Sequence, residues 1–261
     1  LSWRNAKHPI LMLTLKKEGK QVVPLNIELN KDTHLLLISG PNAGGKSVCL
    51  TTVGLLQYMV QSGFLVPLSE ISEMGIFESL LIDIGDEQSL ENDLSTYSSH
   101  LLNMKMFLRS ISPKSIILID EFGSGTEPTV GGAIAEALLG QFLERKTFGV
   151  ITTHFSNLKY FASNAKGIVN GAMMFDVTNI QPLFKLEMGK PGSSFAFEIA
   201  RKIGLPESVL ASASEKVGDE YVSMEKQLRQ IARDKNYWEG KRDKIKRNEK
   251  RLDELVAKFE K

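Results

Sequence analysis

The sequence predicts an α/β fold, in which a mainly parallel sheet is covered by helices on both faces. Strand-length apolar runs rich in β-branched residues occupy residues 34–39, 115–120 and 147–152. Between these runs, apolar residues recur at helical spacing. Strands that alternate with helices form parallel sheets, because each helix carries the chain back to the edge where the next strand begins.

The first half of the fold is expected to begin with two strands, at residues 22–29 and 34–39. The second of them ends at a glycine-rich turn, and after Ser47 the apolar residues follow helical spacing as far as Met59. This helix is expected to stop near Gly63, since glycine is common just past the end of a helix.

The second half continues the alternation of strands and helices. A strand is expected at residues 115–120, a helix through Ala133, Ala137 and Leu138, and a third buried strand at residues 147–152. These strands read as nearly continuous apolar runs, which is typical of strands that are buried on both faces.

Two short helices and a heptad pattern follow the sheet. One helix is expected from Ser193 to Gly204 and the next from Pro206, because proline suits the first position of a helix. Apolar residues then recur in a heptad at Met224, Ile231, Trp238, Ile245, Leu252 and Phe259. The predicted parts are a sheet domain at residues 1–190, a helix-turn-helix at 191–218 and a basic, coiled-coil-like helix at 219–261.

Composition excludes several classes of protein. With 261 residues and 42% hydrophobic side chains the chain can bury a full core, and its apolar runs are far shorter than the roughly 20 residues that span a membrane. The net charge of +1 gives no global basic field, so nucleic-acid binding cannot be argued from overall charge. A single cysteine, Cys49, rules out a disulfide framework within the chain and favours a cytoplasmic location. Because residue 1 is Leu rather than Met, we expect a piece of a longer protein.

The segment GPNAGGKS, at residues 40–47, has the spacing of a phosphate-binding loop (P-loop). Its glycines let backbone N–H groups converge on phosphate oxygens, and the helix that follows presents its positive end to the same oxygens. Lys46 is expected to reach the outer phosphates and the Ser47 hydroxyl to ligate magnesium. The nucleotide-binding residues predicted here are Gly40, Pro41, Asn42, Ala43, Gly44, Gly45, Lys46, Ser47 and Val48.

The segment IILIDEFGSGTEP supplies the acidic residues that such a site needs opposite the loop. Asp120 ends a buried strand, where it can hold magnesium from the other side. Glu121 is well placed to orient or deprotonate the attacking water, so we assign it as the general base. His154, after Thr152 and Thr153 at the end of the third strand, is expected to hydrogen-bond the γ-phosphate or the water. The alternative for the two acidic residues is simple capping of the next helix.

Together these segments resemble the ABC-type ATPases, and more narrowly the ATPase domain of the MutS family. GPNAGGKS resembles the phosphate loop of that family, DEFGSGTEP its metal-binding strand and following loop, TTH its switch histidine, and LSTYSSHL at residues 94–101 its signature segment. VVP at 22–24, GDEQSLENDLSTYSSH at 85–100 and KPGSSFAFEIARKIGLP at 190–206 are most similar to the bacterial type-two branch of MutS homologues. The resemblance covers residues 22–206.

The resemblance implies that a second copy of the chain completes the site. In the family, the signature serine of one subunit meets the γ-phosphate that the other subunit holds. Ser95, followed by Thr96, is the matching position in this sequence. The loop of Gly123, Ser124 and Gly125 is implied to communicate across the same interface.

The resemblance also implies the cofactors and partners. ATP and Mg²⁺ are the implied cofactors, and the aliphatic pair Val22 and Val23 matches the family's adenine clamp, although both valines could be ordinary core residues. The two short helices are implied to form a dimerisation element rather than a DNA reader. In the family, nucleotide state drives a clamp on DNA, and the type-two branch is associated with branched DNA, suppression of recombination and, in some members, stalled ribosomes.

Three functions remain open. The leading one is magnesium-dependent hydrolysis of ATP to ADP by a homodimer, with any nuclease activity in a domain outside this chain. The second is an ATP-binding conformational switch with negligible turnover. The third is another coiled-coil ABC ATPase of the chromosome-maintenance kind, which the short stretch between the phosphate loop and Asp120 disfavours. His8, His34 and His100 have no convergent partners in the sequence and stay unassigned.

Overall fold

The computed structural model describes residues 1–85, 96–176 and 178–217, and isolated positions at 227, 230, 234, 237, 241, 242, 244, 245 and 248. Its centre is a six-stranded sheet in the order β4-β5-β6-β3-β7-β8. The strands are β3 (Thr33–Ser39), β4 (Ser79–Asp83), β5 (Ser115–Ile119), β6 (Phe148–Thr152), β7 (Gly167–Asp176) and β8 (Gln181–Met188). Neighbouring strands are parallel except for β7 and β8. The predicted α/β fold with a mainly parallel sheet is confirmed.

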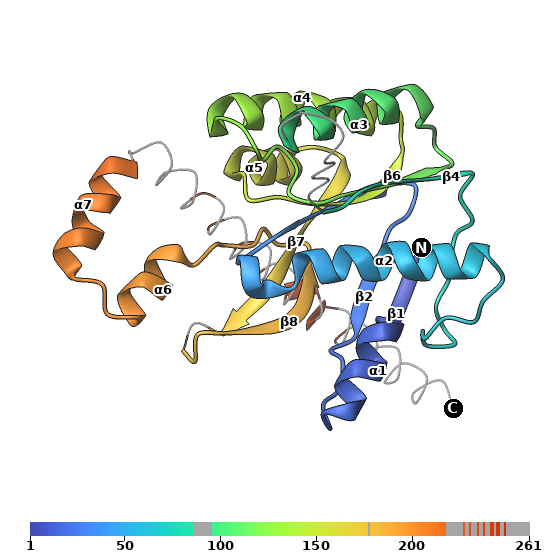
Figure 1. Cartoon of the computed structure of the whole chain (residues 1–261), viewed down its shortest axis with the longest axis horizontal. Coiled ribbons are helices and arrows are strands. Elements are labelled where there is room, and N and C mark those ends of the chain that lie inside the picture. Colours follow the sequence, from blue (N-terminus) through green and yellow to red (C-terminus); the bar gives the residue numbers. More distant parts are fainter. Residues whose placement is uncertain are drawn as a thin grey trace.

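Helices cover both faces of this sheet (Figure 1). One face carries α2 (Lys46–Gln61), and the other carries α3 (Thr96–Ser110), α4 (Pro128–Glu144) and α5 (Ser156–Asn164). Each strand contributes side chains to the cores on both faces of the sheet, because successive side chains of a strand point to opposite faces. In β3, Leu36 and Ile38 pack in the core beneath α2, whereas Leu35 and Leu37 pack in the core beneath α4.

A small second sheet extends the core beneath α2. β1 (Ser2–Ala6) pairs antiparallel with β2 (Leu25–Glu28), and α1 (Pro9–Lys17) connects them. The strand predicted at residues 22–29 is therefore shorter than expected. It begins at Leu25, after Pro24, because proline has no N–H to donate to a ladder of hydrogen bonds.

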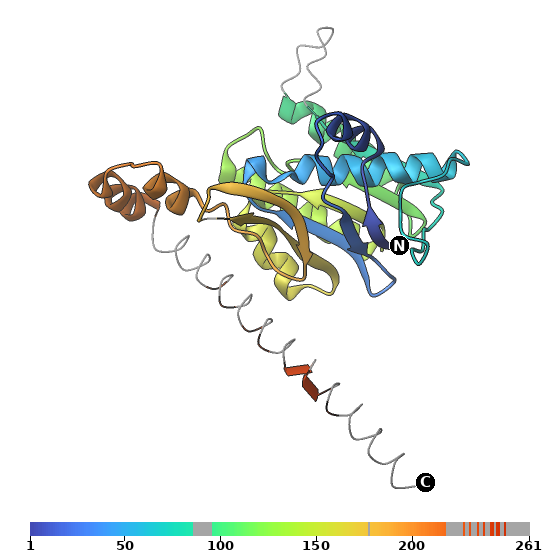
Figure 2. The same cartoon turned by 90° about the horizontal axis from the view of Figure 1, so that it is seen from below.

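Two short helices, α6 (Ala196–Lys202) and α7 (Glu207–Val217), project away from the sheet as an arm (Figure 2). The turn between them places Gly204 at φ +92°, and Arg201 pairs with Glu207 across that turn at 2.9 Å. The first helix begins later than the Ser193 expected from the sequence, because Phe195 has a left-handed backbone at φ +54°.

The segment before the arm is anchored to the end of β3. The Gly192 amide donates a hydrogen bond to Ser39 Oγ at 2.8 Å, and the Gly192 carbonyl accepts one from Lys159 Nζ at 3.3 Å. A Cβ atom at Gly192 would lie 2.4 Å from the Ser39 carbonyl oxygen, so only glycine fits there. The arm is thus attached beside the last residue before the phosphate loop.

The heptad segment lies largely outside the described residues, and so do Met224, Ile231, Trp238, Leu252 and Phe259. Ile245 is described, and it is helical and 55% exposed. Over the part of the chain that the structure describes, every helix is too short or too polar to cross a membrane.

Candidate active site

The phosphate loop joins β3 to α2, as its sequence requires. It contains a short 3-10 turn at Asn42–Gly44, and Gly40 and Gly45 have positive φ angles of +144° and +87°. Glycine is favoured at both positions, because a side chain strains the backbone there. A Cβ atom at Gly45 would also lie 3.1 Å from the ring of Phe184. The glycines therefore leave an open cradle of backbone at the N-terminus of α2, where a helix attracts anions.

Lys46 is the charged group of this cradle. Its side chain is only 3% exposed, and its Nζ donates hydrogen bonds of 3.1 Å to the carbonyl oxygens of Gly40 and Pro41. Burial lowers the pKa of Lys46 from its ordinary value, although the charges of Glu121 and Asp120 oppose the shift. A desolvated ammonium attracts an anion more strongly than one in water, because the local dielectric constant is lower.

Asp120 lies directly after β5 and is held by the neighbouring strand β6. Its Oδ1 accepts a hydrogen bond from the Thr152 hydroxyl and another, of 3.2 Å, from the Glu121 amide. Thr152 Oγ1 in turn accepts from the same Glu121 amide at 2.8 Å. Glu121 has a left-handed backbone at φ +46°. These bonds hold the Glu121 backbone in a conformation that an L side chain rarely adopts.

His154 lies beside the carboxylate of Glu121. The distance from His154 Nε2 to Glu121 Oε1 is 3.9 Å, and the two side chains are 36% and 55% exposed. Burial, with the positive charges of Lys46 and Lys159, lowers the pKa of His154, while Asp120 opposes the shift. The imidazole is therefore neutral at neutral pH and can either donate or accept a hydrogen bond.

A cavity of about 430 Å³ opens beside the phosphate loop, and the valines predicted to contact adenine are among the residues that line it. Val22, Val23 and Val48 line it together with Gly45. Phe184 was not among the predicted contacts, yet its half-exposed ring lines the same cavity. Phe184 comes from β8, a strand that the apolar pattern of the sequence did not predict.

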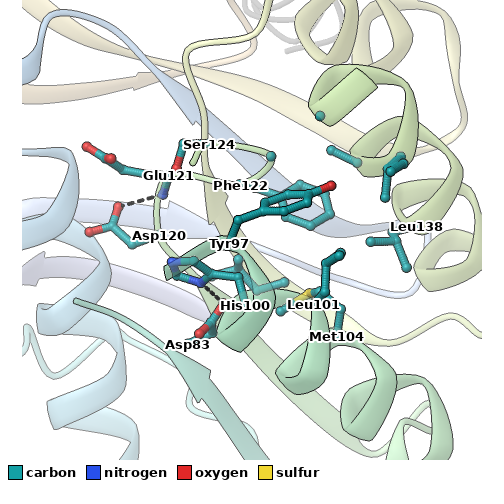
Figure 3. A pocket seen from close by; sticks show the side chains of 15 residues that line it. Asp83, Tyr97, His100, Leu101, Met104, Asp120, Glu121, Phe122, Ser124 and Leu138 are labelled. Atoms are coloured by element: carbon teal, nitrogen blue, oxygen red, sulfur yellow. Dashed lines mark hydrogen bonds and ion pairs between the residues drawn. The ribbon is translucent and has the colours of Figure 1, made fainter. Parts of the chain in front are cut away.

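A third group of residues lines a narrow pocket of about 20 Å³ between α3, α4 and the loop after β5 (Figure 3). The lining includes Asp120 and Glu121 together with Asp83 and His100. His100, unassigned from the sequence, has a partner after all: its Nδ1 lies 2.7 Å from Asp83 Oδ2. Sequence reasoning missed the pair because the strand that ends at Asp83 was not predicted.

One of the two expected signature residues, Thr96, lies at the start of α3. Ser95 is outside the described residues, and Thr96 is the first residue of the helix. Gly125, at φ +91°, packs on Tyr97, the residue after Thr96, since a Cβ atom at Gly125 would lie 3.3 Å from Tyr97 Cβ. The loop that contains Gly123, Ser124 and Gly125 therefore lies against the first turn of α3.

Comparison with known proteins decides the family. The family model described as MutS domain V matches residues 36–219. The chain belongs to the MutS family. MutS domain V has a P-loop ATPase fold, in agreement with the resemblance seen in the motifs and in preference to the chromosome-maintenance alternative.

Curated relatives of this MutS domain V carry the name endonuclease MutS2. The protein from Finegoldia magna is 42% identical over 254 residues, which cover 97% of this chain and 31% of the relative. The protein from Fusobacterium nucleatum is 40% identical over 262 residues, which cover 100% of this chain and 33% of the relative. The chain thus spans about a third of the length of the curated relatives it matches.

The oxygen donors of this MutS domain V fit a magnesium ion. Ser47 is the second residue of α2 and is exposed, and Asp120 places a carboxylate after β5, which β6 separates from β3 in the sheet. Magnesium is typically held by one or two protein oxygens together with substrate phosphates. Within the described ranges no three His, Cys, Asp or Glu side chains gather as a metal site of their own. This donor set suits a metal that arrives with a nucleotide.

Proposed function

We propose that this MutS domain V hydrolyses ATP to ADP and phosphate, with Mg²⁺, in a homodimer whose two copies complete each other's sites. The observation that carries the proposal is the meeting of four groups at one edge of the sheet. Lys46 follows β3, Asp120 and Glu121 follow β5, and His154 follows β6. A cation for phosphate, a carboxylate for metal, and a base beside a neutral imidazole are the parts that phosphoryl transfer to water requires.

In this proposal one set of residues binds the phosphates and the metal, and Glu121 and His154 act on the attacking water. Lys46 and the backbone amides of the loop hold the outer phosphates, and they stabilise the charge that builds up on the phosphate oxygens. Ser47 and Asp120 hold Mg²⁺, which neutralises phosphate charge when bound. Glu121 accepts the proton of the water whose oxygen bonds to the γ-phosphorus, as the bond to the β-phosphate oxygen breaks. His154 donates a hydrogen bond to the γ-phosphate or orients the water.

The adenine is assigned to the cavity beside the loop. Val22, Val23 and Val48 offer aliphatic contacts, and Phe184 offers a ring that packs on Gly45. An apolar cavity next to a phosphate cradle suits a flat base attached to a triphosphate.

The homodimer is the second part of the proposal. Ser95 and Thr96 of one copy are proposed to cover the γ-phosphate of the other, with the loop at 123–125 behind them. The arm formed by α6 and α7 exposes apolar side chains that suit a subunit contact, including Ile203 at 67% and Val209 at 50%. Isologous burial of such side chains is the usual way in which two copies pair.

DNA is the proposed macromolecular partner. Branched or recombining DNA, gripped by a nucleotide-driven clamp, is the form that the family resemblance favours, with stalled ribosomes as a second partner. The endonuclease in the name of the relatives is a property of those proteins, and no residue of this chain is proposed as a nuclease.

Single-turnover kinetics distinguish an ATPase from an ATP-binding switch. With protein in excess over ATP, Glu121→Gln should slow hydrolysis by about 100-fold or more, because a general base typically contributes that much. Ser95→Ala should slow hydrolysis at saturating protein while each copy still binds ATP. Glu144→Gln, an exposed carboxylate on α4, is the matched control and should behave as wild type.

Two outcomes would contradict the proposal. If wild type and Glu121→Gln are equally inert while both dimerise on ATP, the chain is a switch rather than an enzyme. If wild type turns over ATP as a monomer by sedimentation and Ser95→Ala is fully active, the second copy completes nothing.

A further inference from the structure

Asp83, at the end of β4, holds helix α3 with its side chain. The carboxylate is 5% exposed, and it faces His100 Nδ1 at 2.7 Å (Figure 3). It also accepts a hydrogen bond of 2.9 Å from Asn103 Nδ2. Both partners belong to α3, one turn apart on the same side of the helix. A buried carboxylate must be hydrogen-bonded, because leaving it without a donor is strongly unfavourable. The beginning of α3 is thus fixed to the end of β4.

The same residue holds the metal-binding aspartate with its backbone. The Asp83 carbonyl accepts a hydrogen bond of 2.9 Å from the Asp120 amide, which continues the pairing of β4 with β5. Asp83 therefore contacts two elements that the proposed dimer mechanism uses. Its side chain fixes α3, and its backbone fixes Asp120.

The part of α3 that Asp83 fixes is the part closest in sequence to the residues proposed to contact the second copy. The helix begins at Thr96, directly after Ser95, and His100 lies about one turn further on. Tyr97, between them, packs against Gly125 of the loop after β5. Asp83 and His100 also line the same pocket as Asp120 and Glu121, so the pair borders the catalytic loop directly.

We propose that Asp83 and His100 form a positioning pair, which sets the first turn of α3, beginning at the predicted signature residue Thr96, relative to Asp120 of the same copy. In this proposal the pair acts through α3 and through the Asp120 backbone rather than by contact with ATP. The inference rests on the proposed ATPase function. It adds that two parts of the same copy, Asp120 in its own nucleotide site and the first turn of α3 that faces the partner, are held together by Asp83.

The test compares three variants by steady-state ATP hydrolysis at saturating protein. His100→Leu removes the donor and should lower kcat by at least about tenfold while KM for ATP stays the same, since one hydrogen bond to a charged group is lost. His100→Asn keeps an N–H donor near the position of Nδ1 and should recover most of that loss. Gln57→Leu is the control, because it removes a buried hydrogen bond to the Gly75 carbonyl elsewhere in the fold, and it should keep the wild-type kcat.

A second measurement separates positioning from general weakening. By hydrogen exchange, the Asp120 amide and the first turns of α3 should exchange faster in His100→Leu than in wild type, and at the wild-type rate in His100→Asn. If His100→Leu does not fold, Asp83→Asn takes its place, because it keeps the shape of the carboxylate without its charge, and the same loss of kcat at constant KM is expected.

Three results would overturn the positioning pair. They are an unchanged kcat in a folded His100→Leu, a rise in KM that accounts for the whole loss, and a His100→Asn variant as impaired as His100→Leu. A wild-type chain that hydrolyses no ATP refutes the proposed function instead. Hydrogen exchange then tests the positioning pair independently. Faster exchange at Asp120 and α3 in folded His100→Leu supports the pair, and unchanged exchange rejects it.

Discussion

The parallel strands of the central sheet begin at one edge, the amino edge, and end at the opposite one, the carboxyl edge. Both edges bury similar polar side chains, but these side chains have different roles. At the carboxyl edge, Thr152 donates its hydroxyl to Asp120 and accepts the Glu121 amide, so it fixes a loop that carries reactive groups. At the amino edge, Thr147 Oγ1 donates to the Ser115 carbonyl at 3.2 Å, which joins the starts of two strands. Both threonines are completely buried. A buried threonine therefore says little about function until its partner is known.

The edges also differ in the strain that they carry. The carboxyl edge buries the ammonium group of Lys46. A left-handed L residue occurs at both edges, Glu121 at φ +46° at the carboxyl edge and Lys146 at φ +53° at the amino edge, so the buried charge is the difference between them. Burying a charge and holding an L residue in a left-handed conformation both oppose folding. We therefore expect substitutions at the carboxyl edge to lower activity without lowering stability. Substitutions at the amino edge should lower stability without lowering activity.

The largest expected effect is that of Lys46→Met at the carboxyl edge. ATP turnover should fall by about 100-fold or more, because the cation that stabilises the phosphate charge is lost. The free energy of unfolding should not fall, since methionine fills much of the same volume without a buried charge. Urea denaturation and ATP hydrolysis measured on the same preparation check both parts. A large loss of stability would mean that the edge is not strained as described.

A smaller effect is expected from Thr147→Val at the amino edge. Valine keeps the shape of threonine but cannot donate to the Ser115 carbonyl, so the free energy of unfolding should fall by about 1 kcal/mol. Turnover should stay at the wild-type value. Thr14→Val, which removes an exposed hydroxyl bond within α1, is the control and should change stability by less than about 0.5 kcal/mol. A drop in turnover for Thr147→Val would show that the edges are not independent.

The smallest expected effect concerns pH and His34, which is 6% exposed at the amino edge. Burial lowers the pKa of His34, although the backbone at Leu143 and Lys31 opposes the shift. The unfolded chain then binds a proton that the folded chain does not, so stability is complete above a pH of about 6.5 and declines as the pH falls below it. In His34→Leu this part of the decline should be absent. Urea denaturation at several pH values measures it, and identical pH profiles for the two proteins would reject it.

The carboxyl edge was predictable from the sequence for a physical reason. β3, β5 and β6 are buried on both faces, so they read as continuous apolar runs, and each run ends at a residue type that phosphate chemistry uses. The ends of these runs therefore suffice to place Lys46, Asp120 and His154 at one edge of the sheet.

The remaining contacts could not be predicted, because they depend on elements with weak patterns. β8 has one buried side chain, Leu186, so its sequence shows no clear alternation and Phe184 went unnoticed. The partner of His100 lies at the end of β4, which contains one buried residue, Asp83. Pairing across such elements is a property of the tertiary fold, and local spacing does not carry it.

The close approach of Gly192 to Ser39 gives the arm a pivot. Ser39 ends β3 and the phosphate loop starts at the next residue, so any change in the conformation of the loop would act directly on the attachment of the arm. Because α6 and α7 extend outward from that root, a small rotation there becomes a larger displacement at the far end of α7. Any residue larger than glycine at position 192 would lift the root away from the strand and disconnect the two.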